Sequence, residues 1–200
     1  MSDSGSNDED DEHEPVIGEV PREILELAEN CRSYVLQAVG IELDYEPETL
    51  PLLDEYLGRA GTTLDERPDA AKLVALTSGA YFGEVVRRKL DGFWLKKGDT
   101  ELDWQLCARD ALLAMSPAGM VLETLARGAE HEGPSAELVL APDDKQSAAE
   151  RLATLPPVSE EEFFLLSTRL EVIEVVHEML RDQMRVEGRE SITFEESDYE

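Results

Sequence analysis

The amino-acid sequence predicts an α+β fold, in which helices pack on a small antiparallel sheet and a long amphipathic helix lies near the C-terminus. Apolar residues recur three and four positions apart over 21–40, 68–89 and 160–184, which is the spacing of one helix face. Over 92–106 the period changes to an alternation of apolar and polar residues around turn signals, as in a hairpin. Together the two periods predict helices covering one face of a sheet.

Two helices are predicted in the first third of the chain. The first begins at Pro21, a favourable first-turn residue, and ends at Gly40. Pro47 can begin the second helix, and we expect Gly58 and Gly61 to end it. Its predicted inner face consists of Leu50, Leu53 and Leu57.

A third, long helix is predicted from Pro68 to about Lys89. Small residues recur at every fourth position on one of its faces, namely Ala71, Ala75, Gly79 and Gly83. A glycine inside a helix costs about 1 kcal/mol relative to alanine, so the two glycines predict a close backbone approach. Glu84 precedes Arg88 by four positions, the favourable orientation for an ion pair on a helix.

A sheet is predicted after this helix. Asp91-Gly92 and residues 97–99 are turn signals that bound a hairpin, and further strands are expected at 111–115 and 136–140. Phe93 and Leu95 share one face of the hairpin, and Trp94 falls on the other. We expect the ridge of small residues to lie beneath four hairpin residues, Phe93, Leu95, Trp104 and Leu106.

The remaining helices have clear end signals. Ser116 and Pro117 suit the N-cap and first residue of a helix that Gly128 ends. Ser159 and Glu162 form a capping box for the last long helix, 160–184. We expect this helix to dock on the domain. The alternative is homodimerisation through Phe163, Leu170 and Ile173.

The chain is strongly acidic, with 46 Asp and Glu residues against 18 Lys and Arg and a formal net charge of −28. The end stretches SDSGSNDEDDEHE and EESDYE hold 7 and 4 of these acids without any Lys or Arg, so the rest still carries −17. Residues 1–15 are expected to be a disordered acidic arm, residues 20–186 a single α+β domain, and residues 187–200 a polar, frayed tail. The charge disfavours direct binding to nucleic acids and anionic lipids and favours a protein partner with a basic surface. The simpler interpretation is a surface that keeps the protein soluble.

Other features indicate a cytoplasmic location. The acidic start does not resemble a secretory signal, and no apolar run is long enough to cross a bilayer. Cys31 and Cys107 are too few for a disulfide framework. Since Cys31 lies on an apolar helical stripe, we interpret it as a small buried hydrophobe rather than a reactive thiol.

No catalytic motif emerges from the sequence, which has no phosphate loop, nucleophile elbow or dinucleotide fingerprint. Glu174-Val-Val-His177 matches half of a di-iron motif, but the second copy is missing, and Arg181 stands where a zinc-protease helix needs its second histidine. We therefore expect no metal, cofactor or catalytic residues. If the chain is an enzyme with a site of scattered residues, Tyr81, Glu84 and His177 are the candidates.

The stretch TSGAYFGEVVRRKLDGFW, residues 77–94, places three basic residues shortly before a tryptophan. The structural interpretation is a seam between helix and sheet, with cations at the negative end of the helix dipole. The functional interpretation is a partner-binding surface that includes residues of the acidic arm. Its candidate residues are Trp94, Arg87, Arg88, Asp10 and Asp11.

Three stretches in this order, PETLPLLDEYL, GAYFGEVVRRKLDGFW and MSPAGMVLETLARG, resemble a family of uncharacterised bacterial domains. The resemblance covers roughly residues 40–130, and the acidic arm and the last long helix lie outside it. It implies an intracellular α+β domain and carries over no activity or catalytic residue.

The predicted function is therefore a class rather than an activity. We expect a non-enzymatic cytoplasmic protein that binds and regulates a basic protein partner, as an inhibitor or immunity-type antagonist. A special case is nucleic-acid mimicry, in which carboxylates occupy the site of a DNA-binding protein. The rival class is an enzyme without a recognisable motif. We expect a monomer, with a homodimer as the alternative.

Overall fold

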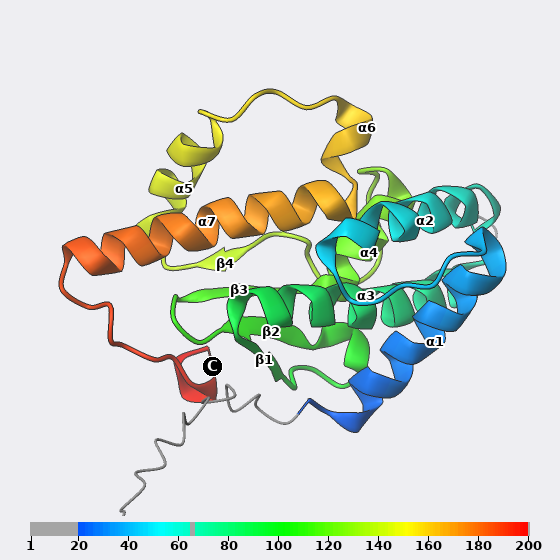
Figure 1. Cartoon of the computed structure of the whole chain (residues 1–200), viewed down its shortest axis with the longest axis horizontal. Helices are drawn as coiled ribbons and strands as arrows, with labels where there is room; N and C mark the ends of the chain where they lie inside the picture. The colour runs from blue at the N-terminus through cyan, green and yellow to red at the C-terminus, as the bar shows by residue number, and fades with distance from the viewer. Residues whose placement is uncertain (1–19, 65–66, 200) are drawn as a thin grey trace, which may run out of the picture.

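The computed structural model describes residues 20–64 and 67–199 (Figure 1). The acidic arm predicted for residues 1–15, with Asp10 and Asp11, lies outside the described residues. The described part has the predicted α+β fold. Its elements in chain order are α1 (Arg22–Val39), η1 (Pro47–Thr49), α2 (Leu50–Leu64), α3 (Pro68–Leu90), β1 (Gly92–Leu95), η2 (Glu101–Asp103), β2 (Gln105–Ala108), β3 (Leu113–Met115), α4 (Pro117–Ala126), β4 (Val139–Leu140), α5 (Asp144–Leu152), α6 (Glu160–Phe163), α7 (Leu166–Val186) and η3 (Glu196–Asp198).

The four strands form one antiparallel sheet in the order β1-β2-β3-β4. In the hairpin, Trp94 lies opposite Leu106, and β3 pairs with both β2 and β4. The strands predicted near 111–115 and 136–140 are thus confirmed as β3 and β4. Each strand therefore pairs with its neighbours in chain order, and α4 lies in the connection between β3 and β4.

Several predicted helix ends are confirmed. Gly40 follows α1 with a φ of 84°, a left-handed conformation that glycine adopts without strain. Ser116 precedes α4, and its hydroxyl accepts a hydrogen bond of 3.0 Å from the Gly119 amide. Pro68 is the first residue of α3. These local signals needed no long-range contact to be recognised.

The predicted end of α2 is wrong. The helix continues through Gly58 and Gly61 to Leu64. Glycine lowers helix stability without preventing helix formation. The three predicted inner leucines, Leu50, Leu53 and Leu57, are buried and hold the helix against the core.

The last predicted helix is interrupted. The capping box of Ser159 and Glu162 begins the four-residue helix α6, and α7 begins separately after Leu165, whose backbone is extended. The Asp54 carboxylate of α2 accepts hydrogen bonds from the amides of Leu166 at 2.7 Å and Ser167 at 3.2 Å. A residue more than a hundred positions away in the chain therefore caps α7.

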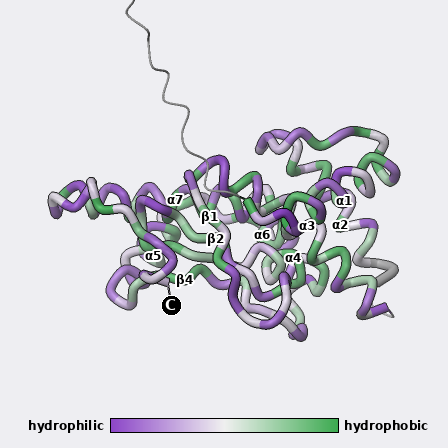
Figure 2. The backbone as a smooth tube through the Cα atoms, turned by 90° about the horizontal axis from the view of Figure 1, so that it is seen from below, coloured by the Kyte–Doolittle hydropathy of each residue, from purple (hydrophilic) through white to green (hydrophobic). Residues whose placement is uncertain are grey.

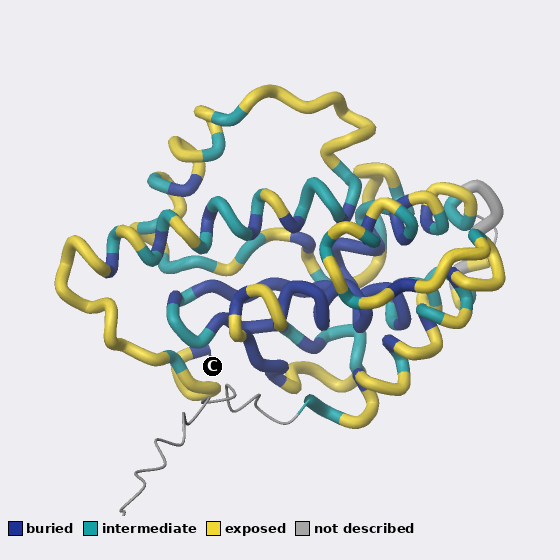
Figure 3. Tube along the Cα trace, in the orientation of Figure 1, coloured by how far each residue is buried: buried dark blue, intermediate teal, exposed yellow. Residues whose placement is uncertain are grey.

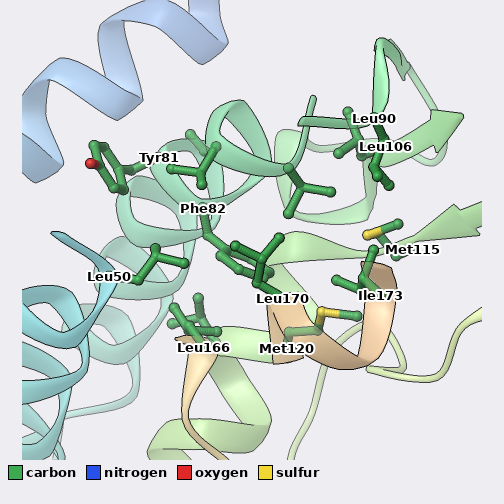
Figure 4. Packing of buried hydrophobic residues seen from close by; sticks show 14 of the residues in the cluster. Leu50, Tyr81, Phe82, Leu90, Leu106, Met115, Met120, Leu166, Leu170 and Ile173 are labelled. Carbon is green, nitrogen blue, oxygen red and sulfur yellow. The ribbon is translucent and has the colours of Figure 1, made fainter. Parts of the chain in front are cut away.

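The α7 helix docks on its own chain, as expected. Its apolar face is buried through Leu166, Leu170, Ile173, Val176, Leu180 and Met184. Figure 4 shows Leu166, Leu170 and Ile173 among side chains of the other elements, and hydrophilic and hydrophobic residues alternate along the helices in Figure 2. Of the three residues proposed for homodimerisation, Leu170 and Ile173 are thus already covered, whereas Phe163 remains 45% exposed.

Both faces of the sheet are covered. Trp94, Leu106 and Met115 belong to the main core with the helices. Phe93 and Leu95 lie on the opposite face, in a second cluster with Cys107, Ala114 and Tyr199. The expectation that Phe93 and Leu95 would lie over the small-residue ridge is therefore wrong, because alternation along the strand sends Trp94 to the helices instead.

The C-terminal segment, expected to fray, forms the cover of this second face. Figure 3 shows its end turning from exposed to buried beside the sheet. The Tyr199 hydroxyl lies 2.6 Å from the Ala108 carbonyl oxygen and accepts a hydrogen bond from the Leu113 amide at 3.3 Å. The Phe194 amide donates to the Arg109 carbonyl oxygen at 2.6 Å. Two aromatic residues thus anchor an otherwise polar segment.

The two glycines of α3 have the predicted close neighbours. A Cβ atom on Gly79 would lie 2.8 Å from the backbone nitrogen and Cα of Ala118 in α4. A Cβ atom on Gly83 would overlap the ring of Trp94. The close backbone approach is therefore made by α4, and the hairpin contributes a tryptophan ring.

Candidate functional site

Two of the candidate partner-binding residues, Trp94 and Arg87, lie in the interior. Their exposed fractions are 8% and 5%, and both contact the Glu84 carboxylate, which is 1% exposed. Arg87 donates to both oxygens of Glu84, at 2.9 and 3.1 Å, and the Trp94 indole N–H donates at 2.8 Å. This arrangement pairs a buried charge and ties β1 to α3, so neither side chain is offered to a partner in this conformation.

The ion pair predicted between Glu84 and Arg88 does not form. Arg88 is exposed, and its guanidinium carbon lies 4.1 Å from the ring centroid of Tyr45. Tyr45 stacks on Tyr81 with ring centroids 4.8 Å apart. Of the basic residues in the candidate surface, Arg88 is thus the one whose side chain reaches solvent, over an aromatic pair.

The Tyr81 hydroxyl is engaged in hydrogen bonds with the segment between α1 and α2. Its hydroxyl accepts a hydrogen bond of 2.8 Å from the Tyr45 amide and lies 3.3 Å from the Thr49 hydroxyl. Burial raises the pKa of Tyr81, which keeps the phenol protonated. The phenol therefore fixes the segment between α1 and α2 rather than presenting a reactive oxygen.

His177 belongs to a different cluster. Its Nε2 lies 2.7 Å from Oδ1 of Asp110, and Arg181 contacts the other oxygen at 3.1 Å. Burial alone would raise the pKa of Asp110, but the hydrogen bond with His177 and the charges of His177 and Arg181 hold it below its usual value. The cluster clamps the turn between β2 and β3 onto α7.

The three residues considered for an enzyme are not brought together. Within residues 20–64 and 67–199, no hydrogen bond or ion pair joins His177 to Tyr81 or Glu84. Each side chain has its own structural partners. Both thiols are buried, and burial raises the pKa of Cys31 and of Cys107 to about 12, so neither is poised as a nucleophile.

Ion pairs within the chain engage most of its basic side chains. The paired residues are Arg22, Arg32, Arg59, Arg87, Lys89, Lys96, Arg169, Arg181, Arg185 and Arg189. Because the chain holds 46 acidic residues and 18 basic ones, this pairing leaves an excess of exposed carboxylates. Glu160 and Glu161 are exposed and have no ion pair within the described part. The outward charge is therefore negative, and many of the cations are paired with neighbouring acids on the surface.

A pocket of about 510 Å³ lies between α2, α4 and α6. Its lining includes Gly58 and Gly61 of α2, Leu125 of α4, and Phe164 and Glu161 at α6. Neither the pocket nor its glycines were singled out as a site from the sequence, because the three elements are distant in the chain. The volume falls within the range usual for ligand pockets.

The described residues include neither a metal-ligand cluster nor a membrane-spanning helix. There, no group of three or more His, Cys, Asp or Glu side chains is arranged to hold a metal ion. No helix in the same part of the chain combines the length and apolar character needed to span a bilayer.

Comparisons with models of protein families, with curated proteins and with solved structures give no significant match. The resemblance of residues 40–130 to uncharacterised bacterial domains therefore receives no support from them and remains an expectation.

Proposed function

We propose that this protein is an acidic, non-enzymatic regulator in the cytoplasm that binds a protein partner with a basic surface, as an inhibitor or immunity-type antagonist. The observation that carries the proposal is the uneven use of charge. Ten of the 18 basic side chains form ion pairs with acidic residues of the same chain, most of them on the surface, while carboxylates such as Glu160 and Glu161 face solvent unpaired within the described residues.

Such a surface favours a cationic partner for two physical reasons. Opposite fields raise the rate of encounter, and like charges exclude acidic competitors and phosphate backbones. At physiological ionic strength, salt screens the interaction between exposed charges that are more than about 8 Å apart. The association rate must therefore fall as salt is added.

The test is co-purification of the tagged full-length chain from its host at low and moderate salt, followed by association kinetics with the purified partner. We expect a stoichiometric basic protein whose association rate falls with salt and with deletion of residues 1–15. The melting temperature of the deletion variant should be unchanged. If DNA competes with the chain for that partner, the regulator is a nucleic-acid mimic.

The enzyme alternative predicts the opposite pattern. If the chain is an enzyme, no protein should be retained in co-purification, and a small molecule should raise the melting temperature of the isolated chain. That result would overturn the proposed function.

A further inference from the structure

Gly58 and Gly61 of α2 form the floor of the pocket between α2, α4 and α6. Helix propensity does not explain why glycine stands at these two positions. Glycine inside a helix lowers helix stability relative to alanine, and Gly58 and Gly61 both lie inside α2. Among the described residues, a Cβ on Gly58 would meet no atom within 4 Å, and one on Gly61 would meet the Leu125 carbonyl oxygen at 3.7 Å. Unlike Gly79, these glycines are not required by packing. They leave the α2 side of the pocket without side chains at these two positions.

The walls of the pocket are apolar and firmly held. Leu57, Leu125 and Phe164 contribute apolar side chains. The Phe164 carbonyl oxygen accepts a hydrogen bond of 2.6 Å from the Thr124 hydroxyl of α4. The Phe164 ring also packs edge-on against Phe163, with centroids 5.2 Å apart. The tip of the ring lies against Gly128, and the Arg169 guanidinium carbon lies 5.9 Å from the ring centroid. The Phe164 ring is therefore held in place as one wall of the pocket.

The charges of the lining are mostly negative. Among the described lining residues, the acids Glu160, Glu161 and Asp54 outnumber the cation Arg127. The oxygens of Asp54 accept hydrogen bonds from the start of α7, and Glu162 is used by the capping box of Ser159. Glu160 and Glu161 thus remain as carboxylates available to a ligand.

An arginine side chain fits this combination. Its aliphatic stem suits apolar walls, its planar guanidinium stacks on aromatic rings, and its N–H groups pair with carboxylates. The same choice agrees with the negative charge of the whole chain, which attracts basic surfaces.

We propose that the pocket between α2, α4 and α6 receives an arginine side chain of the protein partner. This inference rests on the proposed function and makes it specific, because it names the place where one residue of the partner is recognised. Glu160 and Glu161 bind the guanidinium, Phe164 contributes an apolar wall beside it, and the glycine floor admits its stem.

The test is titration of the ¹⁵N-labelled full-length chain with Nα-acetyl-arginine methylamide, followed by amide chemical shifts. Saturable shifts are expected at Gly58 and Gly61, and the matching glutamate derivative should produce none. The double variant Glu160→Gln/Glu161→Gln should weaken arginine binding at least fivefold. The control Glu137→Gln/Glu171→Gln removes two exposed charges elsewhere and should stay within twofold of the wild type.

A filling variant separates the pocket from general electrostatics. Gly58→Leu places a side chain where the structure has open space, so the fold should persist while the shifts at Gly61 disappear. Equal shifts with both derivatives, or unchanged arginine binding in Gly58→Leu, would overturn the pocket assignment. If a basic partner is nevertheless retained in co-purification, the regulator function stands and this pocket is not its site. If the arginine derivative binds here while no basic partner co-purifies, the pocket assignment stands and the function fails.

Discussion

Two helices of this protein carry a pair of interior glycines, and the two pairs have opposite surroundings. Gly79 and Gly83 of α3 press against the backbone of α4 and the ring of Trp94, where a methyl group has no room. Gly58 and Gly61 of α2 border open space beside α4 and α6. The same residue type therefore permits close packing in one helix and an empty pocket in the other.

A glycine inside a helix therefore does not by itself indicate close packing against a neighbouring element. Both pairs lower helix stability by about 1 kcal/mol per residue relative to alanine. In α3 the close approach of α4 and β1 offsets this loss, whereas in α2 no such contact does. The difference lies in neighbours from other parts of the chain.

The largest expected effect concerns the buried carboxylate that holds Trp94 over Gly83. Glu84→Ala leaves the Arg87 charge buried without its partner, which should lower the free energy of unfolding by about 3–5 kcal/mol. Urea unfolding monitored by tryptophan fluorescence measures this loss. The matched control is Glu26→Ala in the exposed pair with Arg22, which should cost less than about 1 kcal/mol. Similar losses in the two variants would show that the contact at Gly83 is not firmly held.

The next effect tests the contact between α3 and α4. Gly79→Leu forces a large side chain against the backbone of Ala118 and should lower the free energy of unfolding by about 3 kcal/mol or more. Gly58→Leu, the same change beside open space, is the control and should unfold near the wild-type denaturant concentration. An unchanged melting temperature for Gly79→Leu would refute the close approach.

Much of the fold could be predicted because its signals are local. The cap at Ser116, the left-handed residue Gly40 and the alternation through β1 are read from a few neighbouring residues. The break before α7 could not be predicted, since it depends on Asp54 of α2. The packing of Tyr199 on the sheet was equally hidden, because its partners lie about ninety positions earlier.

The candidate site was harder to predict than the fold. Spacing alone favoured a pair between Glu84 and Arg88, but Glu84 is buried with its i+3 neighbour Arg87 and with Trp94 of β1, which both donate to its carboxylate. The pocket depends on three elements that meet only in the folded chain. From the sequence, Gly58 and Gly61 were expected to end α2, so they were not expected to line a pocket.

A smaller effect tests how the wall of the pocket is fixed. Asp54→Ala removes the acceptor of the first amides of α7 and should lower the free energy of unfolding by about 1–2 kcal/mol, as loss of an N-cap does. Asp54→Asn retains an acceptor oxygen and should lose less. Thermal unfolding of both variants measures the difference. A loss as large in Asp54→Asn as in Asp54→Ala would mean that the negative charge, rather than the acceptor, holds α7.

The most direct measurement compares alanine at the two kinds of glycine, by urea unfolding of Gly79→Ala, Gly58→Ala and Gly61→Ala under identical conditions. The Gly79 variant should lose about 1–2 kcal/mol, because overpacking against Ala118 outweighs the gain in helix propensity. The two α2 variants should each gain up to about 1 kcal/mol, because the added methyl group meets open space or an ordinary contact. The predicted result is a change in the free energy of unfolding of opposite sign in the two helices. A loss in Gly58→Ala and Gly61→Ala as large as that in Gly79→Ala would contradict the difference between a closely packed α3 and an open α2.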